Sequence, residues 1–215
     1  MKKLLSLFGF VLLATGLATA QLRYEINPYG GYRIGGDFKF TVFDTDITHE
    51  IDLESGPEFG LNASVGLSPG FYVELQWARQ NTTLKPKRVI DLEMQPMLDI
   101  TVDYYHLAFL FQYAYDRLQP FGYFGLGWTG FYPADPFNSQ TKFSMSGGGG
   151  IKYYITRSFG LRAQARFITS SMNSESGDIW CDFYGCWSTT RINWLTQWSF
   201  TGGLIFRFGS KGRRF

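Results

Sequence analysis

Histidine and cysteine have the most versatile side-chain chemistry in this sequence, and there are only two of each. His106 lies in a segment of alternating polarity beside Tyr104, where an acidic residue such as Glu74 could reach it. Nucleophilic hydrolysis needs a histidine with a nearby serine and a carboxylate. The residues that flank His106 in the sequence include no serine, and His49 has no evident partner. We therefore expect His106 to be a structural polar group, and we predict no catalytic residue.

The two cysteines form the most specific local motif. Cys181 and Cys186 are separated by four residues, and Asp182 and Gly185 suit a turn between them. In a loop that faces an oxidising compartment such a pair forms a disulfide, whereas a redox or zinc motif needs closer cysteines or further ligands. We predict the disulfide, with free reactive thiols as the alternative. Four aromatic side chains around this tip are candidates for a binding surface, unless they rest on the rim of the fold: Trp180, Phe183, Tyr184 and Trp187.

The acidic and basic residues outside this motif do not form a recognisable ligand site. The segment 37–54 is acidic, but the spacing of Asp44 and Asp46 lacks the full calcium-loop pattern, so a solvated loop is expected. We expect no metal ion and no cofactor. Leaving out Lys2 and Lys3 reduces the 20 lysines and arginines to 18, equal to the 18 aspartates and glutamates. This balance gives no reason to expect nucleic acid as a partner.

The amino terminus has the pattern of a cleaved leader. Two lysines precede an apolar run over residues 4–14 that is too short to span a bilayer, and residues 18–20 fit a small-residue cleavage site. We predict a signal peptide over residues 1–20 and a single domain over residues 21–215. The alternative is a cytoplasmic chain whose first helix happens to be apolar.

The rest of the chain alternates in polarity with the period of two that is typical of β-strands. Aromatic residues make up 19% of the sequence and glycines number 25, which suits strands with one apolar face and one small or polar face. The alternation predicts eight strands, over about residues 23–36, 55–67, 71–84, 99–113, 120–131, 141–154, 159–167 and 190–208. Short turns near residues 68, 116 and 157 alternate with long loops over 37–54, 85–98, 132–140 and 170–189.

This arrangement of short and long connections is typical of an up-and-down β-barrel whose outer face meets lipid. The aromatic residues on the apolar face fall into two sets, one near each end of the predicted strands. The set beside the long loops is Phe59, Trp77, Tyr105, Trp128, Phe143, Phe167 and Trp194, and the set beside the short turns is Phe71, Tyr113, Tyr153, Phe159 and Phe208. We therefore predict an all-β fold, an eight-stranded antiparallel up-and-down transmembrane β-barrel.

The opposite face of these strands carries charged and amide side chains. An eight-stranded barrel is just wide enough for inward side chains to fill it, so charges inside it must pair. We predict a lumen network of Glu25, Arg33, Glu74, Gln76, His106, Arg162 and Arg166, extended by Glu58, Arg207, Gln164 and Gln197. Such a network leaves no open aqueous channel. A gated pore or a polar ligand site is the alternative.

Three segments resemble the outer-membrane β-barrel domain family and its OmpA/OmpX-type eight-stranded members: EINPYGGYR over 25–33, DYYHL over 103–107 and PFGYFGLG over 120–127. The resemblance covers nearly the whole chain after the leader. The closing residues look like the carboxyl-terminal signal that the barrel-assembly machinery recognises, with Thr201, Gly203, Phe206 and Phe208 at the matching positions. The basic tail over residues 209–215 departs from that pattern, because such barrels often stop at their final aromatic residue.

The resemblance implies a monomeric protein of the bacterial outer membrane, surrounded by outer-membrane lipid and lipopolysaccharide and inserted by the barrel-assembly machinery. We expect a non-enzymatic structural or surface-interaction role carried by the exterior loops, above all by the loop that contains Cys181 and Cys186. One alternative is passage or binding of small hydrophobic molecules, as proposed for OmpW-type proteins, and another is enzymatic modification of lipid A. The alternative fold is a soluble lipocalin-like barrel, which would bury its apolar face inside.

Overall fold

The computed structural model describes residues 23–41, 48–86, 98–113, 116–134, 139–171, 180–182, 185–187 and 194–209. The predicted signal peptide, the tail after Gly209, and both Phe183 and Tyr184 lie outside the described residues. In the described part of the chain, no helix has the length and apolar character needed to cross a membrane.

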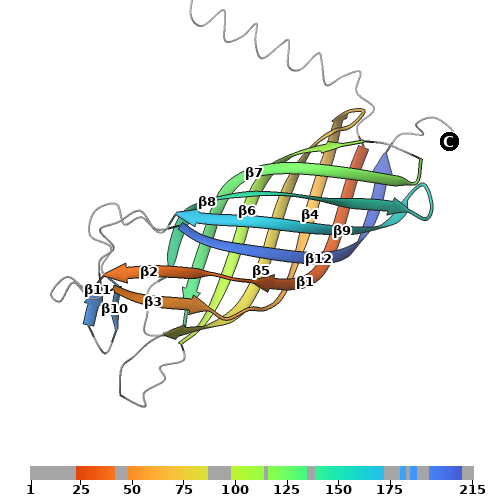
Figure 1. The fold of residues 1–215 in the computed structure, drawn as a ribbon. Helices are drawn as coiled ribbons and strands as arrows, with labels where there is room; N and C mark the ends of the chain where they lie inside the picture. The colour runs from red at the N-terminus through yellow and green to blue at the C-terminus, as the bar shows by residue number, and fades with distance from the viewer. Residues whose placement is uncertain are drawn as a thin grey trace, which may run out of the picture.

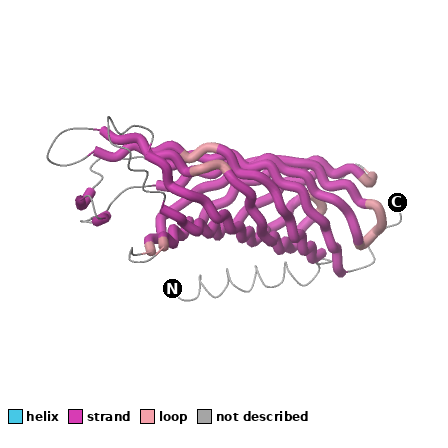
Figure 2. Tube along the Cα trace, turned by 90° about the horizontal axis from the view of Figure 1, so that it is seen from below, coloured by secondary structure: helices cyan, strands magenta, loops and turns pink. Residues whose placement is uncertain are grey.

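Eight long strands form a closed antiparallel barrel (Figures 1 and 2). Each pairs with the next in the order β1-β4-β5-β6-β7-β8-β9-β12, and β12 pairs with β1 to complete the circuit. The predicted fold class is therefore confirmed. The strands are β1 (Arg23–Ile34), β4 (Gly56–Ser68), β5 (Phe71–Pro86), β6 (Leu98–Gln112), β7 (Leu118–Pro133), β8 (Gln140–Tyr154), β9 (Phe159–Ser171) and β12 (Trp194–Gly209).

The two ends of the barrel differ in their connections. The β4–β5 turn and the β8–β9 turn lie at one end, which we call the turn end, together with the link between β6 and β7. Gly70 completes the β4–β5 turn with a φ of 90°, a left-handed conformation that glycine adopts without strain. The opposite end, which we call the loop end, carries the four long connections.

Two of the predicted long loops contain hairpins. Strands β2 (Asp37–Thr41) and β3 (Thr48–Leu53) pair with each other and project from the loop end (Figure 1). β3 also pairs with the last residues of β5, from Leu84 to Pro86. Strands β10 (Trp180–Asp182) and β11 (Gly185–Trp187) form a separate two-stranded sheet. The interpretation of 37–54 and 170–189 as plain loops was wrong, because such short strands leave too few alternating residues to detect.

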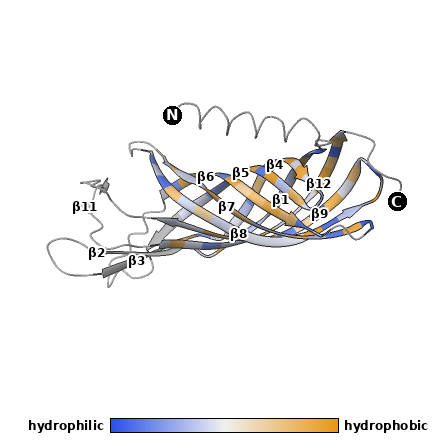
Figure 3. Ribbon diagram, turned by 90° about the horizontal axis from the view of Figure 1, so that it is seen from above, coloured by the Kyte–Doolittle hydropathy of each residue, from blue (hydrophilic) through white to orange (hydrophobic). Residues whose placement is uncertain are grey.

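Buried and exposed residues alternate along the barrel strands as the sequence predicts, and hydrophilic and hydrophobic residues are interspersed along the same strands (Figure 3). On β5, Leu75 is 63% exposed on the outside, whereas its neighbour Glu74 is fully buried inside. Phe111 and Leu161 also lie on the outer surface, with 61% and 45% of their area exposed. Apolar side chains therefore cover the outside of the barrel and polar ones occupy much of the lumen.

Apolar side chains also gather inside the barrel in two clusters, and the larger of them lies at the loop end, beside buried polar residues such as Gln80 and Ser170. We call this larger group the loop-end cluster: Tyr29, Leu53, Ala78, Ile100, Val102, Tyr104, Phe131, Ile168 and Leu195. All of its members are at least nine-tenths buried. The sequence predicts a lumen network of charged and amide side chains but not this apolar cluster, which forms where the strands continue past the region that needs an apolar outer surface.

The aromatic side chains on the outer surface contact one another in pairs at both ends of the barrel. Near the loop end, Phe59 and Trp77 lie 5.9 Å apart between ring centroids, and Phe167 and Trp198 lie 5.1 Å apart. Near the turn end, the rings of Phe159 and Phe206 are 5.6 Å apart. These rings form two bands around the outside of the barrel, as the sequence predicts.

Candidate functional site

The lumen contains the largest group of buried polar residues in the described part of the protein, and it is built from layers of ion pairs. In one layer, Arg162 on β9 donates two hydrogen bonds to Glu74 on β5, from Nη1 at 2.6 Å and from Nη2 at 2.9 Å. Gln76 and Ser64 donate to the same carboxylate, at 2.8 and 3.0 Å. Arg162 also donates from Nε to Gln164. The carboxylate of Glu74 is thus saturated with donors, as a buried charge requires.

A second layer surrounds Glu25 nearer the turn end. Its carboxylate accepts hydrogen bonds from Lys152 Nζ at 2.7 Å, from the Tyr154 hydroxyl at 2.7 Å and from Arg207 Nη2 at 2.8 Å. Lys152 also donates to Gln112 at 3.0 Å, and its ammonium lies 4.7 Å from the ring centroid of Tyr72. One carboxylate therefore connects strands β1, β8 and β12.

A third layer borders the loop-end cluster. Arg33 on β1 forms a buried ion pair with Glu58 on β4, and the Ser199 hydroxyl donates to the other carboxylate oxygen of Glu58. The guanidinium of Arg33 lies 3.8 Å from the ring centroid of Tyr104. Tyr104 in turn donates its hydroxyl hydrogen bond to Gln197 at 2.5 Å.

His106 has a different partner from the ones that the sequence suggests. Its Nε2 lies 3.0 Å from the hydroxyl of Ser144 on β8, in place of the expected neighbours Tyr104 and Glu74. The sequence analysis missed this serine because 38 residues separate it from His106 along the chain. Among the described residues, the buried Nδ1 atom of His106 has no hydrogen-bond partner. In that part of the chain the pair therefore consists of a serine and a histidine, without the carboxylate that orients the ring in a nucleophilic triad.

Arg166 is held differently from the other lumen arginines. It is fully buried, and its Nε donates to the hydroxyl of Tyr123 at 3.1 Å. Its guanidinium also faces the ring of Tyr29, at 5.5 Å from the centroid. Within the described residues, neither Nη atom has a hydrogen-bond partner. The direct contacts of this cation there are the hydroxyl of Tyr123 and the ring of Tyr29.

Two of these contacts join opposite walls of the barrel. In the strand order, β5 and β9 are four strands apart in either direction, and so are β6 and β12. The Glu74–Arg162 pair crosses the lumen between the first two strands, and the Tyr104–Gln197 hydrogen bond crosses it between the second two. These two contacts place polar side chains in the middle of the lumen at two levels along the barrel.

Sequence reasoning omitted several members of the network. Lys152 was assigned to the inner face but not to an ion pair, and Tyr154 and Ser199 were not assigned to the network. The alternation along the strand places Lys152 on the inner face, and this pattern could have identified it as a member of the lumen network. Its partner Glu25 lies on a strand that is not adjacent to β8, and strand alternation alone cannot identify such pairs.

The remaining predicted site residues lie elsewhere on the barrel. Thr201 and Gly203 face the lumen side of β12, while Phe206 and Phe208 lie on its outer surface near the turn end. At the loop end, the backbone register of β10 and β11 places Cys181 directly opposite Cys186, and Trp180 opposite Trp187.

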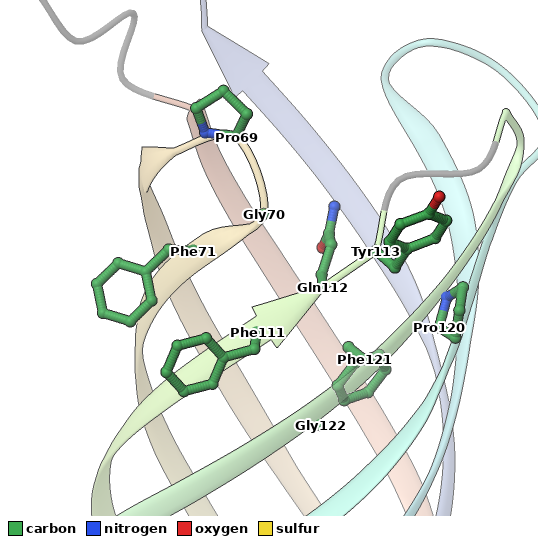
Figure 4. Close-up of a pocket in the computed structure, with 9 residues that line it drawn as sticks. All are labelled: Pro69, Gly70, Phe71, Phe111, Gln112, Tyr113, Pro120, Phe121 and Gly122. Atoms are coloured by element: carbon green, nitrogen blue, oxygen red, sulfur yellow. The ribbon is translucent and has the colours of Figure 1, made fainter.

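A shallow hollow of about 610 Å³ lies at the turn end of the barrel. It is lined mainly by Pro69, Phe71, Phe111, Tyr113 and Pro120. Figure 4 shows the rings of Phe71 and Phe111 beside each other, and their centroids are 5.2 Å apart. Its lining also includes the inward-facing Gln112 and Phe121, so the hollow lies at the turn-end rim, between the outer surface and the lumen.

Comparison with known proteins places this geometry in a family. The family model of the outer membrane protein beta-barrel domain matches residues 10–185. The crystal structure of OprG from Pseudomonas aeruginosa superposes with a TM-score of 0.59 at 15% identity, covering 89% of this chain and 97% of that chain. The crystal structure of Neisserial surface protein A superposes with a TM-score of 0.53 at 9% identity, covering 88% and 98%.

At these identities the two structures share the fold alone. No curated protein sequence matches the chain. The family model, however, spans most of the sequence, and the closed eight-stranded barrel with its apolar exterior has the architecture expected in the bacterial outer membrane. The chain belongs to the outer membrane protein beta-barrel domain family.

Proposed function

We propose that this protein is a sealed, non-enzymatic outer-membrane scaffold whose exterior loops carry a structural or surface-interaction role. The observation that supports this most strongly is the pair of contacts across the lumen, Glu74 with Arg162 and Tyr104 with Gln197. Side chains that meet across an eight-stranded barrel occupy the space that a solute would need. In this family long loops face the exterior and short turns the periplasm, so the hairpins at the loop end are the parts available to partners.

Planar-bilayer recording tests the seal. The wild-type protein should give little or no stable conductance, because side chains meet across the lumen at two levels. The variant E74A/R162A/Y104A, in which the side chains that meet across the lumen are truncated, should conduct ions when folded. It is the positive control that the recording detects an open barrel of this width. Large, steady currents through the wild-type protein would contradict the proposal.

The disulfide between Cys181 and Cys186 is part of the same proposal. Their positions opposite each other on β10 and β11 support it, because cross-strand neighbours lie within the range of Cα separations that a disulfide spans. Peptide mass spectrometry with and without reductant tests the bond directly. Recovery of both cysteines as free thiols from protein prepared without reductant would contradict it.

The role of the hairpin can be separated from that of the lumen. Replacing residues 181–186 by a short polar turn should reduce adhesion or envelope resistance in cells while leaving the amount of folded barrel unchanged. A replacement within the turn over residues 156–158, at the opposite end, is the matched control. Equal phenotypes for the two replacements would argue against a role for the exterior hairpin.

Binding of a small apolar molecule is the second candidate, and the loop-end cluster is the observation that favours it. This cluster offers an apolar environment inside the barrel at the end that faces the exterior. Phe131→Ala should enlarge that environment and Phe131→Trp should fill it. If the wild-type protein binds one medium-chain hydrocarbon and the tryptophan variant does not, this second role is preferred over a purely sealed scaffold.

A further inference from the structure

Three consecutive cross-strand pairs on the outer surface of β5 and β6 form a group that we call the polar ladder: Arg79–Asp103, Asn81–Thr101 and Thr83–Asp99. Each pair is joined by side-chain hydrogen bonds. Arg79 donates from Nε and Nη2 to the two oxygens of Asp103, both at 2.7 Å. Thr101 donates to Asn81, and Thr83 donates to Asp99, each at 3.2 Å.

The polar ladder begins directly above the aromatic band. The pair that precedes it in the register is Trp77 with Tyr105, and the guanidinium of Arg79 lies 5.9 Å from the ring of Trp77. A membrane-spanning strand needs about 9–11 residues. Counted from Phe71 in the turn-end band, that length ends between Arg79 and Asn81. The 16 residues of β5 therefore carry the ladder beyond the acyl chains.

The layer that lies against the ladder is then the headgroup layer of the outer leaflet. The wall below the ladder is continuous with it and is covered by lipid-facing residues such as Leu75 and Leu107. In the outer leaflet of this membrane the phosphorylated disaccharide of lipid A lies directly above the acyl chains, and the core sugars of lipopolysaccharide follow it outward. The ladder is thus positioned against saccharide and not against hydrocarbon.

The chemistry of the ladder distinguishes sugar hydroxyls from phosphates. Its groups comprise one guanidinium, two carboxylates, an amide and two hydroxyls, of which the Asp103 carboxylate is only 2% exposed and is paired with Arg79. The charge of the ladder therefore does not favour an anionic ligand. Hydroxyl groups both donate and accept, and they suit such a mixed set. Exposed aromatic rings adjoin it, with Tyr132 on β7 43% exposed and Trp128 on β7 55% exposed, and these can pack against the apolar faces of sugar rings.

The opposite wall provides a comparison at the same height. On β9 and β12 the pair above the aromatic contact of Phe167 and Trp198 is Thr169 with Thr196. This pair carries hydroxyl groups but neither a guanidinium nor a carboxylate. We propose that the polar ladder of β5 and β6 is a docking surface for the core sugars of outer-leaflet lipopolysaccharide, recognised through their hydroxyl groups.

Native mass spectrometry of the full-length purified protein tests this proposal, with equimolar competition between lipopolysaccharide that carries a complete core oligosaccharide and lipid A alone. The wild-type protein should prefer the core-bearing form. In the variant R79M/D103L the ratio of bound core-bearing lipopolysaccharide to bound lipid A should fall at least about threefold. The free energy of such a change is less than the usual contribution of one hydrogen bond. The matched control T169V/T196V should keep it.

A second variant guards against misfolding. N81A/T101V leaves the buried Asp103 and its partner Arg79 in place and changes one exposed and one half-buried side chain. It should also reduce the preference, so the proposal can be tested even when R79M/D103L does not fold. Heat-modifiable migration on gels shows which variants are folded. An unchanged preference in the folded ladder variants, an equal loss in the control, or equal binding of lipid A and core-bearing lipopolysaccharide by the wild-type protein would overturn the proposal.

Discussion

The wall formed by β5 and β6 changes character between the middle of the barrel and the loop end. In the middle, Leu75 and Leu107 face outward while Glu74 lies inside. At the loop end, Asn81 and Thr101 face outward while apolar members of the loop-end cluster lie inside. Along the same two strands, the arrangement of polar and apolar side chains therefore changes from that of a membrane barrel to that of a soluble barrel.

The difference shows that the surroundings of the barrel determine the polarity of its outer side chains. The inner side chains then have the opposite polarity. Where lipid covers the outside, the apolar outer side chains contact the lipid, so the fold does not need an apolar interior. Charge pairs can then fill the lumen. Where water or sugar covers the outside, an apolar interior supplies the hydrophobic stabilisation that the lipid no longer provides. The boundary lies near the aromatic band that includes Trp77 and Tyr105.

The largest effect should come from breaking an ion pair in the middle of the barrel. Arg162→Leu leaves Glu74 buried and unpaired, and should lower the free energy of unfolding by about 3–5 kcal/mol. The double variant R162L/E74L should lose much less, because no buried charge remains. Denaturant titration in lipid vesicles measures both. Equal destabilisation by the single and double variants would show that packing, and not charge, dominates this layer.

At the loop end the corresponding effect should come from an apolar residue. Ile168→Ala removes a buried side chain of the loop-end cluster and should cost about 2–5 kcal/mol of unfolding free energy. The neighbouring Thr169→Ala, on the outer face, should change it by no more than about 0.5 kcal/mol. The same titration measures the pair. A loss below about 1 kcal/mol for Ile168→Ala would mean that this end has no stabilising core.

Arginine substitutions on the outer face can locate the boundary between the lipid-facing wall and the loop end. Leu107→Arg places a cation on the lipid-facing surface and should cost about 2–4 kcal/mol. Ser171→Arg, on the outer face of β9 at the loop end, should cost only about 0–1 kcal/mol. Unfolding free energies in vesicles check both values. If the two substitutions cost the same, the membrane extends farther toward the loop end than the aromatic band indicates.

The smallest effect compares the two faces of a single strand at adjacent glycines. A Cβ added at Gly203 would lie 2.4 Å from the carbonyl oxygen of Pro28 and 2.7 Å from Nδ2 of Asn27, whereas one added at Gly202 meets nothing within 4 Å. Gly203→Ala should therefore destabilise the barrel by about 1–3 kcal/mol, and Gly202→Ala by less than about 0.5 kcal/mol. Thermal unfolding followed by heat-modifiable migration ranks them. The reverse ranking would contradict the inward orientation of Gly203.

Alternation along the chain was sufficient to predict the barrel and the direction of most side chains. Phe111 and Leu161 lie outside, and Glu25 and Arg166 lie inside, because a strand has only two faces and the period of two assigns them. The hairpin of β2 and β3 was missed because the strands are five and six residues long. The contact between His106 and Ser144 was missed because it joins strands that are not adjacent in the barrel.

The sequence by itself therefore determined the eight barrel strands, the lipid-facing surface and the family, since these depend on local periodicity and on the residues at the two ends of each strand. Only the tertiary structure decided which charges pair across the lumen and where the polarity of the wall reverses. Closing the sheet brings Glu74 to Arg162 and Tyr104 to Gln197, and such contacts depend on the register and tilt of strands that lie far apart along the chain.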